Sequence, residues 1–114
     1  MRFLPSVDAP SEIIEEYSSR EATTTRVADG SGDAHAHLVR IGAGGIIDRH
    51  VAGFGQLWIV VEGSGWVAGE DGRRHEVRTG DIAFFERGEH HAKGSESGMI
   101  AVMVQIRDLA PSSG

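Results

Sequence analysis

The chain has 114 residues, of which 39% are hydrophobic and 25% are charged, values that suit one globular domain with one core. Its formal net charge is −6 and it has no basic block, so nucleic acid is disfavoured as a partner. It contains no cysteine, which excludes disulfides, thiolate metal sites and cysteine nucleophiles.

The apolar runs of the chain are short and are separated by many glycines. No run approaches the length of a membrane span, and no segment at the start resembles a signal peptide. We therefore expect a cytoplasmic protein with no membrane partner. The chain has 16 glycines, about twice the usual share. Many turns between short apolar runs favour an all-β fold.

The first third of the chain is predicted to form an arm and edge strands. Residues 1–10 contain two prolines and read as an extended arm. Residues 11–17 begin with a serine that could cap a short helical turn, although a strand is the alternative. The β-branched segment 23–28 predicts a strand, and the Asp-Gly-Ser-Gly segment 29–32 predicts a turn.

The middle of the chain predicts the central strands. Residues 34–41 alternate in character, which predicts a strand with His37 on one of its faces. The stretch 44–65 contains the apolar run 57–61, which is bounded by glycines. Such a run predicts a buried strand.

The remainder of the chain predicts further short strands separated by glycine turns. They are expected at residues 66–68, 74–77, 82–85, 90–93 and 99–106. This makes about eight to ten strands with little helix and no strand-helix alternation, which indicates a β-sandwich or barrel. We expect a single domain over residues 1–114, divided into an N-terminal arm with edge strands, a conserved barrel and a polar tail: 1–33, 34–106 and 107–114.

Two glycine-histidine patterns lie within the predicted barrel. In the first, five residues separate Gly44 from His50, and a glycine follows at Gly63. In the second, Gly80 leads to a further glycine and then to His91. These spacings resemble the two motifs of the cupin superfamily, small double-sheet β-barrels of jelly-roll type. The resemblance is to short bacterial cupins and implies a double-stranded β-helix.

The glycines of these patterns are predicted to serve turns that need unusual backbone angles. They are Gly44, Gly63, Gly80 and Gly88.

The chain departs from the cupin pattern at the positions that hold metal. By resemblance, these positions supply three histidines and one carboxylate. His50 and His91 are present, but Ala52 and Gln56 replace the second histidine and the glutamate. Two imidazoles and one amide oxygen could still hold Zn, Ni, Fe or Cu. The candidates to complete such a shell are water, Asp48 and His37.

The predicted ligand pocket consists of His50, Gln56, Trp58 and His91. Gln56 and Trp58 are two residues apart and therefore share one face of a strand, which in the resembled fold points inward. The alternative is that the histidines are hydrogen-bonded core residues and that Trp58 only fills the core. No catalytic residue is assigned.

The resemblance implies a protein that binds a small organic molecule inside the barrel. Isomerase or cyclase-type chemistry, assisted by a metal or by the histidines, is one possibility. The alternative is a non-catalytic ligand-binding or sensor module that has lost the metal site. We also expect a homodimer, because Phe3 and Leu4 of the arm have no evident local core and because sheet edges need cover.

Overall fold

A computed structural model describes residues 1–112 of the chain. Within them the chain forms ten strands and one short 3-10 helix, Ser6–Asp8. The strands in chain order are β1 (Arg2–Leu4), β2 (Glu12–Ile13), β3 (Thr23–Thr24), β4 (Ala28–Ile41), β5 (Gly45–Val51), β6 (Gly55–Ala68), β7 (Arg74–Arg78), β8 (Ile82–Phe85), β9 (His90–Ser95) and β10 (Met99–Pro111).

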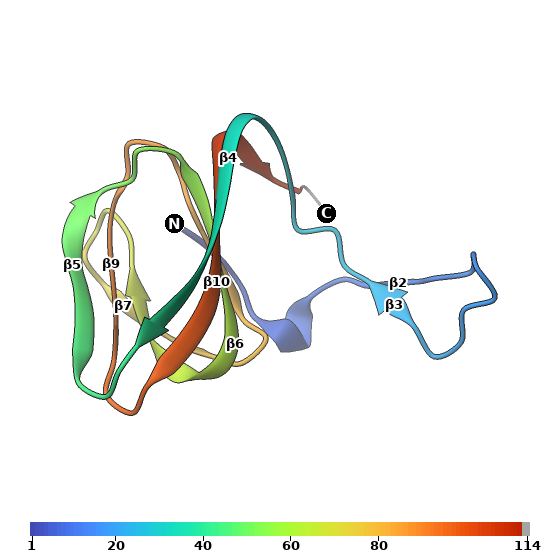
Figure 1. The fold of residues 1–114 in the computed structure, drawn as a ribbon, viewed down its shortest axis with the longest axis horizontal. Coiled ribbons are helices and arrows are strands. Elements are labelled where there is room, and N and C mark those ends of the chain that lie inside the picture. Colours follow the sequence, from blue (N-terminus) through green and yellow to red (C-terminus); the bar gives the residue numbers. More distant parts are fainter. Residues whose placement is uncertain (113–114) are drawn as a thin grey trace.

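Two antiparallel layers share the long strand β6. Residues 55–63 of β6 pair with β10, which also pairs with β4, and the early part of β6 pairs with β8, which is flanked by β1. Residues 64–68 of β6 pair with β7 and β9, and β9 also pairs with β5. In Figure 1, β5, β7 and β9 face β4, β6 and β10 across the barrel. This is a jelly-roll double-stranded β-helix, so the all-β prediction is confirmed.

The core lies between these two layers. Trp58 and Phe85 are its largest fully buried apolar side chains, and Met99 and Ala101 from β10 pack in the same cluster. Alternation along β6 places Gln56 on the same side as Trp58 and Val60. Gln56, which is only 2% exposed, therefore places an amide beside these apolar side chains.

The four motif glycines have the backbone angles that were predicted. Their φ values are 77° at Gly44, 80° at Gly63, 93° at Gly80 and 89° at Gly88, a region that other residues rarely adopt. At Gly63 a Cβ would also lie 2.2 Å from the carbonyl oxygen of Gly98. Here β6 passes from one layer to the other, so both conformation and space require glycine.

The turn expected at residues 29–32 is wrong, because these residues lie inside β4. The long strand β10 pairs with β4 as far as Ala28 opposite Pro111, with an irregularity between Ile106 and Asp108. The pairing partner therefore overrides the local turn preference. For the same reason, the expected polar tail 107–114 is strand as far as Pro111, and its residues 113–114 lie outside the described part.

The N-terminal arm pairs with its own barrel. β1 runs antiparallel to β8, with Phe3 opposite Ala83, and Met1 packs against the core. Phe3 and Leu4 therefore lie in an edge strand of the barrel, where Phe3 remains 38% exposed.

The β2–β3 hairpin forms a separate two-stranded sheet. Its first strand lies in the segment 11–17, for which a strand was the alternative to a helical turn. The hairpin projects away from the barrel in Figure 1. Ile13 and Tyr17 in this region are 75% and 92% exposed. Within residues 1–112, no helix is long and apolar enough to cross a membrane.

Candidate functional site

The two motif histidines meet across strands β5 and β9. His50 and His91 are paired in register, and their ring centroids lie 4.3 Å apart with the planes tilted by 49°. His91 is only 1% exposed, whereas His50 is exposed. The pair therefore runs from the surface at His50 into the interior at His91.

Hydrogen bonds give the two imidazoles opposite proton arrangements. His50 Nδ1 lies 2.8 Å from the carbonyl oxygen of Asp48. Because a carbonyl can only accept, Nδ1 of His50 donates, which leaves Nε2 as the acceptor of the neutral ring. His91 Nδ1 lies 2.6 Å from Nζ of Lys93. When Lys93 is protonated its ammonium can only donate, so Nδ1 of His91 then accepts and Nε2 carries the proton.

Lys93 is the only lysine of the chain and is only 1% exposed. Its amine lies 4.8 Å from the ring centroid of Trp58 and 4.5 Å from that of Phe85. None of the ion pairs within residues 1–112 includes it. Burial without a carboxylate lowers the pKa of Lys93 from 10.5 to about 7.

The same environment keeps His91 neutral. Burial first, and then the positive charges of Lys93 and His50, lower the pKa of His91 from 6.5 to about 3. At neutral pH the barrel therefore presents an uncharged imidazole beside an amine.

Three buried polar atoms have no hydrogen-bond partner among the described barrel residues. They are Oε1 of Gln56, Nε1 of Trp58 and Nε2 of His91. Buried polar groups in proteins are nearly always paired, because an unpaired group retains its full desolvation cost. All three atoms lie on the core-facing sides of β6 and β9.

All four predicted pocket residues therefore lie in the barrel, and His50 and His91 lie in direct contact. The two further residues considered for a metal shell do not join them. The carboxylate of Asp48 accepts a hydrogen bond from the backbone of Arg49. His37 is exposed on β4, opposite Met103.

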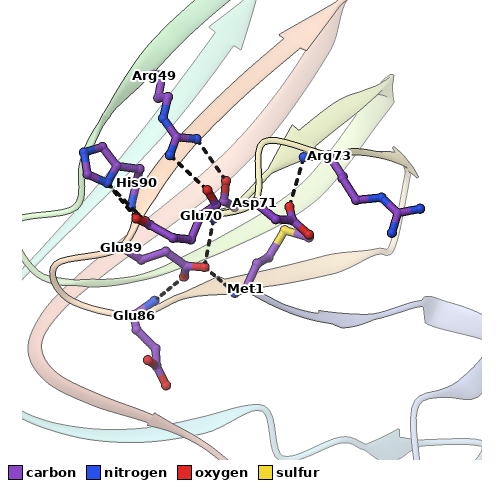
Figure 2. Close-up of polar contacts among 9 residues, drawn as sticks. Met1, Arg49, Glu70, Asp71, Arg73, Glu86, Glu89 and His90 are labelled. Carbon is purple, nitrogen blue, oxygen red and sulfur yellow. Dashed lines mark hydrogen bonds and ion pairs between the residues drawn. The ribbon is translucent and has the colours of Figure 1, made fainter.

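His90, the neighbour of His91, belongs to a separate polar network at the end of the barrel. Figure 2 shows its imidazole meeting the carboxylate of Glu70 while Glu89 contacts the backbone nitrogen of Met1. Hydrogen bonds from the backbone and then the side chain of His90 lower the pKa of Glu70. The backbone oxygen of Glu70 also accepts from Arg49. This network links the turn at Glu70 to His90 and Arg49. Of the two adjacent histidines, only His91 faces the interior.

The donor set does not fit a tightly bound divalent cation. Residues 1–112 contain no group of three or more His, Cys, Asp or Glu side chains placed to hold a metal. Nδ1 of His91 faces the amine of Lys93, so only Nε2 is open to a ligand. The amine of Lys93 adds positive charge, and Gln56 supplies no negative charge to balance it.

Sequence reasoning missed Lys93. The sequence did contain a signal for the position of Lys93. Lys93 follows His91 by two residues in a predicted strand, so the two side chains must lie on the same face of that strand. Lysine is rarely buried without a partner, so its side chain reads as solvated until the fold is known. Phe85 also contacts His91, with ring centroids 4.9 Å apart.

The comparisons with known proteins agree with this architecture. The model of the AraC-like ligand binding domain family matches residues 36–106. No curated protein matches the chain.

Solved structures with this fold come from several bacteria. A Klebsiella pneumoniae protein with a double-stranded β-helix domain is 23% identical, with 77% of this chain and 82% of that chain covered and a TM-score of 0.61. An RmlC-like cupin from Shewanella frigidimarina is 19% identical, with 75% and 70% covered and a TM-score of 0.61. A Neisseria meningitidis protein is 26% identical, with 82% and 88% covered and a TM-score of 0.57.

Proposed function

Because the chain belongs to the family of AraC-like ligand-binding domains, within the cupin superfamily, we propose that its barrel binds a small organic molecule without a metal ion. The observation that carries this proposal is the set of three unpaired polar atoms in the barrel, on Gln56, Trp58 and His91. A bound molecule would supply their missing hydrogen bonds. His50 would lie at the entrance, since it is exposed and its ring contacts that of the buried His91.

The apolar surroundings suit such a ligand. Trp58 and Phe85 are both fully buried, and aromatic walls with a few placed polar groups are typical of small-molecule sites. In this arrangement Gln56 accepts a hydrogen bond from the ligand, whereas Trp58 and His91 donate to it.

The test is ligand binding by chelator-treated protein. The chain has two tryptophans, so Trp66→Phe leaves Trp58 as the only tryptophan reporter. We expect a member of a panel of sugars, amino acids, organic acids, amides and alcohols to change the fluorescence of Trp58 and to raise the melting temperature. Trp66→Phe must first be shown to fold as the wild type does.

His91→Phe should remove this binding, because it deletes a buried polar group at the site. His75→Ala is the matched control, since His75 is exposed on β7 and should not affect binding. If no compound of any class shifts either signal, or if His91→Phe binds as well as wild type, the barrel is not the ligand site.

A second candidate function is histidine-assisted proton transfer on the bound molecule, as in isomerases or cyclases. It is favoured by the opposite proton arrangements of His50 and His91, whose rings lie 4.3 Å apart. His50 offers an acceptor nitrogen and His91 a donor, which are the two roles that general acid–base catalysis needs. A bound carbonyl compound should then exchange its α-protons in D₂O, and His50→Ala should abolish the exchange. Binding without exchange would leave a non-catalytic module.

A further inference from the structure

Lys93 places a basic amine inside the barrel beside two aromatic rings and a neutral histidine. We propose that the ligand of the barrel carries a carboxylate group that pairs with the ammonium of Lys93. This inference rests on the proposed function and names the chemical class of the ligand. The apolar remainder of the ligand would contact Trp58 and Phe85.

The first argument is the missing counter-charge. Lys93 is almost completely buried, and the ion pairs of the described chain involve other residues. A buried charge is costly unless it is paired, and removing one partner of a buried pair leaves the other uncompensated. In the barrel the protonated form of Lys93 has no carboxylate partner among the described residues. A ligand carboxylate would complete the pair.

The second argument is the balance of donors and acceptors. The interior presents N–H donors from Lys93, from Nε2 of His91 and from Nε1 of Trp58, whereas Oε1 of Gln56 is the unpaired acceptor. An ionised carboxylate only accepts and can take several hydrogen bonds at once. A neutral alcohol would use fewer of these donors. Three donors against one acceptor therefore favour an anion over a sugar-like ligand, and Oε1 of Gln56 would take its hydrogen bond from another group of the ligand.

The surroundings of the amine support the same conclusion. The aromatic faces of Trp58 and Phe85 lie 4.8 and 4.5 Å from Nζ, and such faces attract a cation without neutralising it. His50 and His91, the titratable groups paired across β5 and β9, bring no negative charge.

The test uses pairs of compounds that differ only in charge: propionate and propionamide, butyrate and butyramide, benzoate and benzamide. Affinities are measured for chelator-treated protein at pH 6.5 and low salt by calorimetry. We expect at least one acid to bind about tenfold or more tightly than its amide, the scale of a charge-assisted hydrogen bond. Lys93→Met should remove this preference, whereas Arg40→Met, which removes an exposed cation, should keep it.

A second measurement does not depend on any variant folding. Because Lys93 is the only lysine, protein labelled with ¹³Cε-lysine has one lysine Hε–Cε signal, and the acid should shift it more than the amide does.

Equal affinities for acid and amide, an unmoved lysine signal, or acid binding that survives Lys93→Met would each overturn the carboxylate assignment. If neutral members of the wider panel bind while all acids fail, this inference falls and the proposed function stands. If no compound binds at all, both fall.

Discussion

Replacing Lys93 by methionine should change how stability depends on pH. The substitution keeps the length of the side chain and removes the amine. In the folded chain burial lowers the pKa of Lys93 from 10.5 to about 7, whereas in the unfolded chain the amine is hydrated and keeps its ordinary value. Between these two values the unfolded chain binds more protons than the folded chain. The unfolding free energy of wild type should therefore rise with pH across this window.

The magnitude follows from the same two values. Each pH unit well inside the window contributes about 1.4 kcal/mol. Half-protonation at the folded pKa reduces the change between pH 7 and pH 9 to about 2 kcal/mol, and the full window has a ceiling of about 5 kcal/mol. His91 adds little above pH 7, because its pKa falls from 6.5 to about 3 on folding and its pH dependence therefore lies below pH 7. The loss of its hydrogen bond to Lys93 is therefore a constant offset.

The assay is urea unfolding followed by tryptophan fluorescence at pH 7, 8 and 9 for wild type, Lys93→Met and Arg40→Met. The stability advantage of Lys93→Met over wild type should shrink as pH rises, while Arg40→Met runs parallel to wild type. Equal m-values would show that all three unfold between comparable states. Parallel curves for wild type and Lys93→Met would refute the reasoning, since they would mean that Lys93 is not a desolvated amine.

Three further outcomes test other parts of the fold. Gly94→Ala should lower the unfolding free energy by about 1–3 kcal/mol, because its Cβ would lie 2.5 Å from the Trp66 ring. Gly53→Ala, with nothing within 4 Å of its Cβ, should not, and equal urea midpoints would contradict this. The chain should be a homodimer, with about twice the 12.2 kDa chain mass in light scattering, since β4 is a long edge strand and the β2–β3 hairpin exposes apolar side chains. A monomer mass at micromolar concentration would exclude it. Ala52→His with Gln56→Glu should raise Ni²⁺ affinity about tenfold or more in calorimetry, whereas equal, negligible binding in wild type and variant would contradict this expectation.

The features that sequence predicted well are local or depend on fixed spacing. The positive φ angles at Gly44 and Gly80 follow from glycine's own conformational freedom within short turns. His50 and His91 could be brought to one pair of strands because each lies at a set distance from such a turn. Resemblance to a known motif added the non-local information that strand alternation alone does not contain.

The features that sequence missed depend on which strands become neighbours. The Asp-Gly-Ser-Gly segment 29–32 has strong turn character, yet it is strand because β10 is long enough to pair with all of β4. Burial of Lys93 has the same origin. Its face was predictable from His91, but whether that face meets solvent or Trp58 depends on how β9 packs against β6.

The departures from the cupin metal motif and the buried lysine all disfavour a bound metal ion. Ala52 removes a donor, Gln56 removes a negative charge, and Lys93 adds a positive one next to His91. A divalent cation beside an ammonium, with no carboxylate in contact with either, would be repelled in a medium of low polarity. An anion in the same place would be attracted by Lys93 and would accept from the N–H groups of His91 and Trp58. The substitutions that weaken the site for a metal are therefore the ones that suit it to a carboxylate.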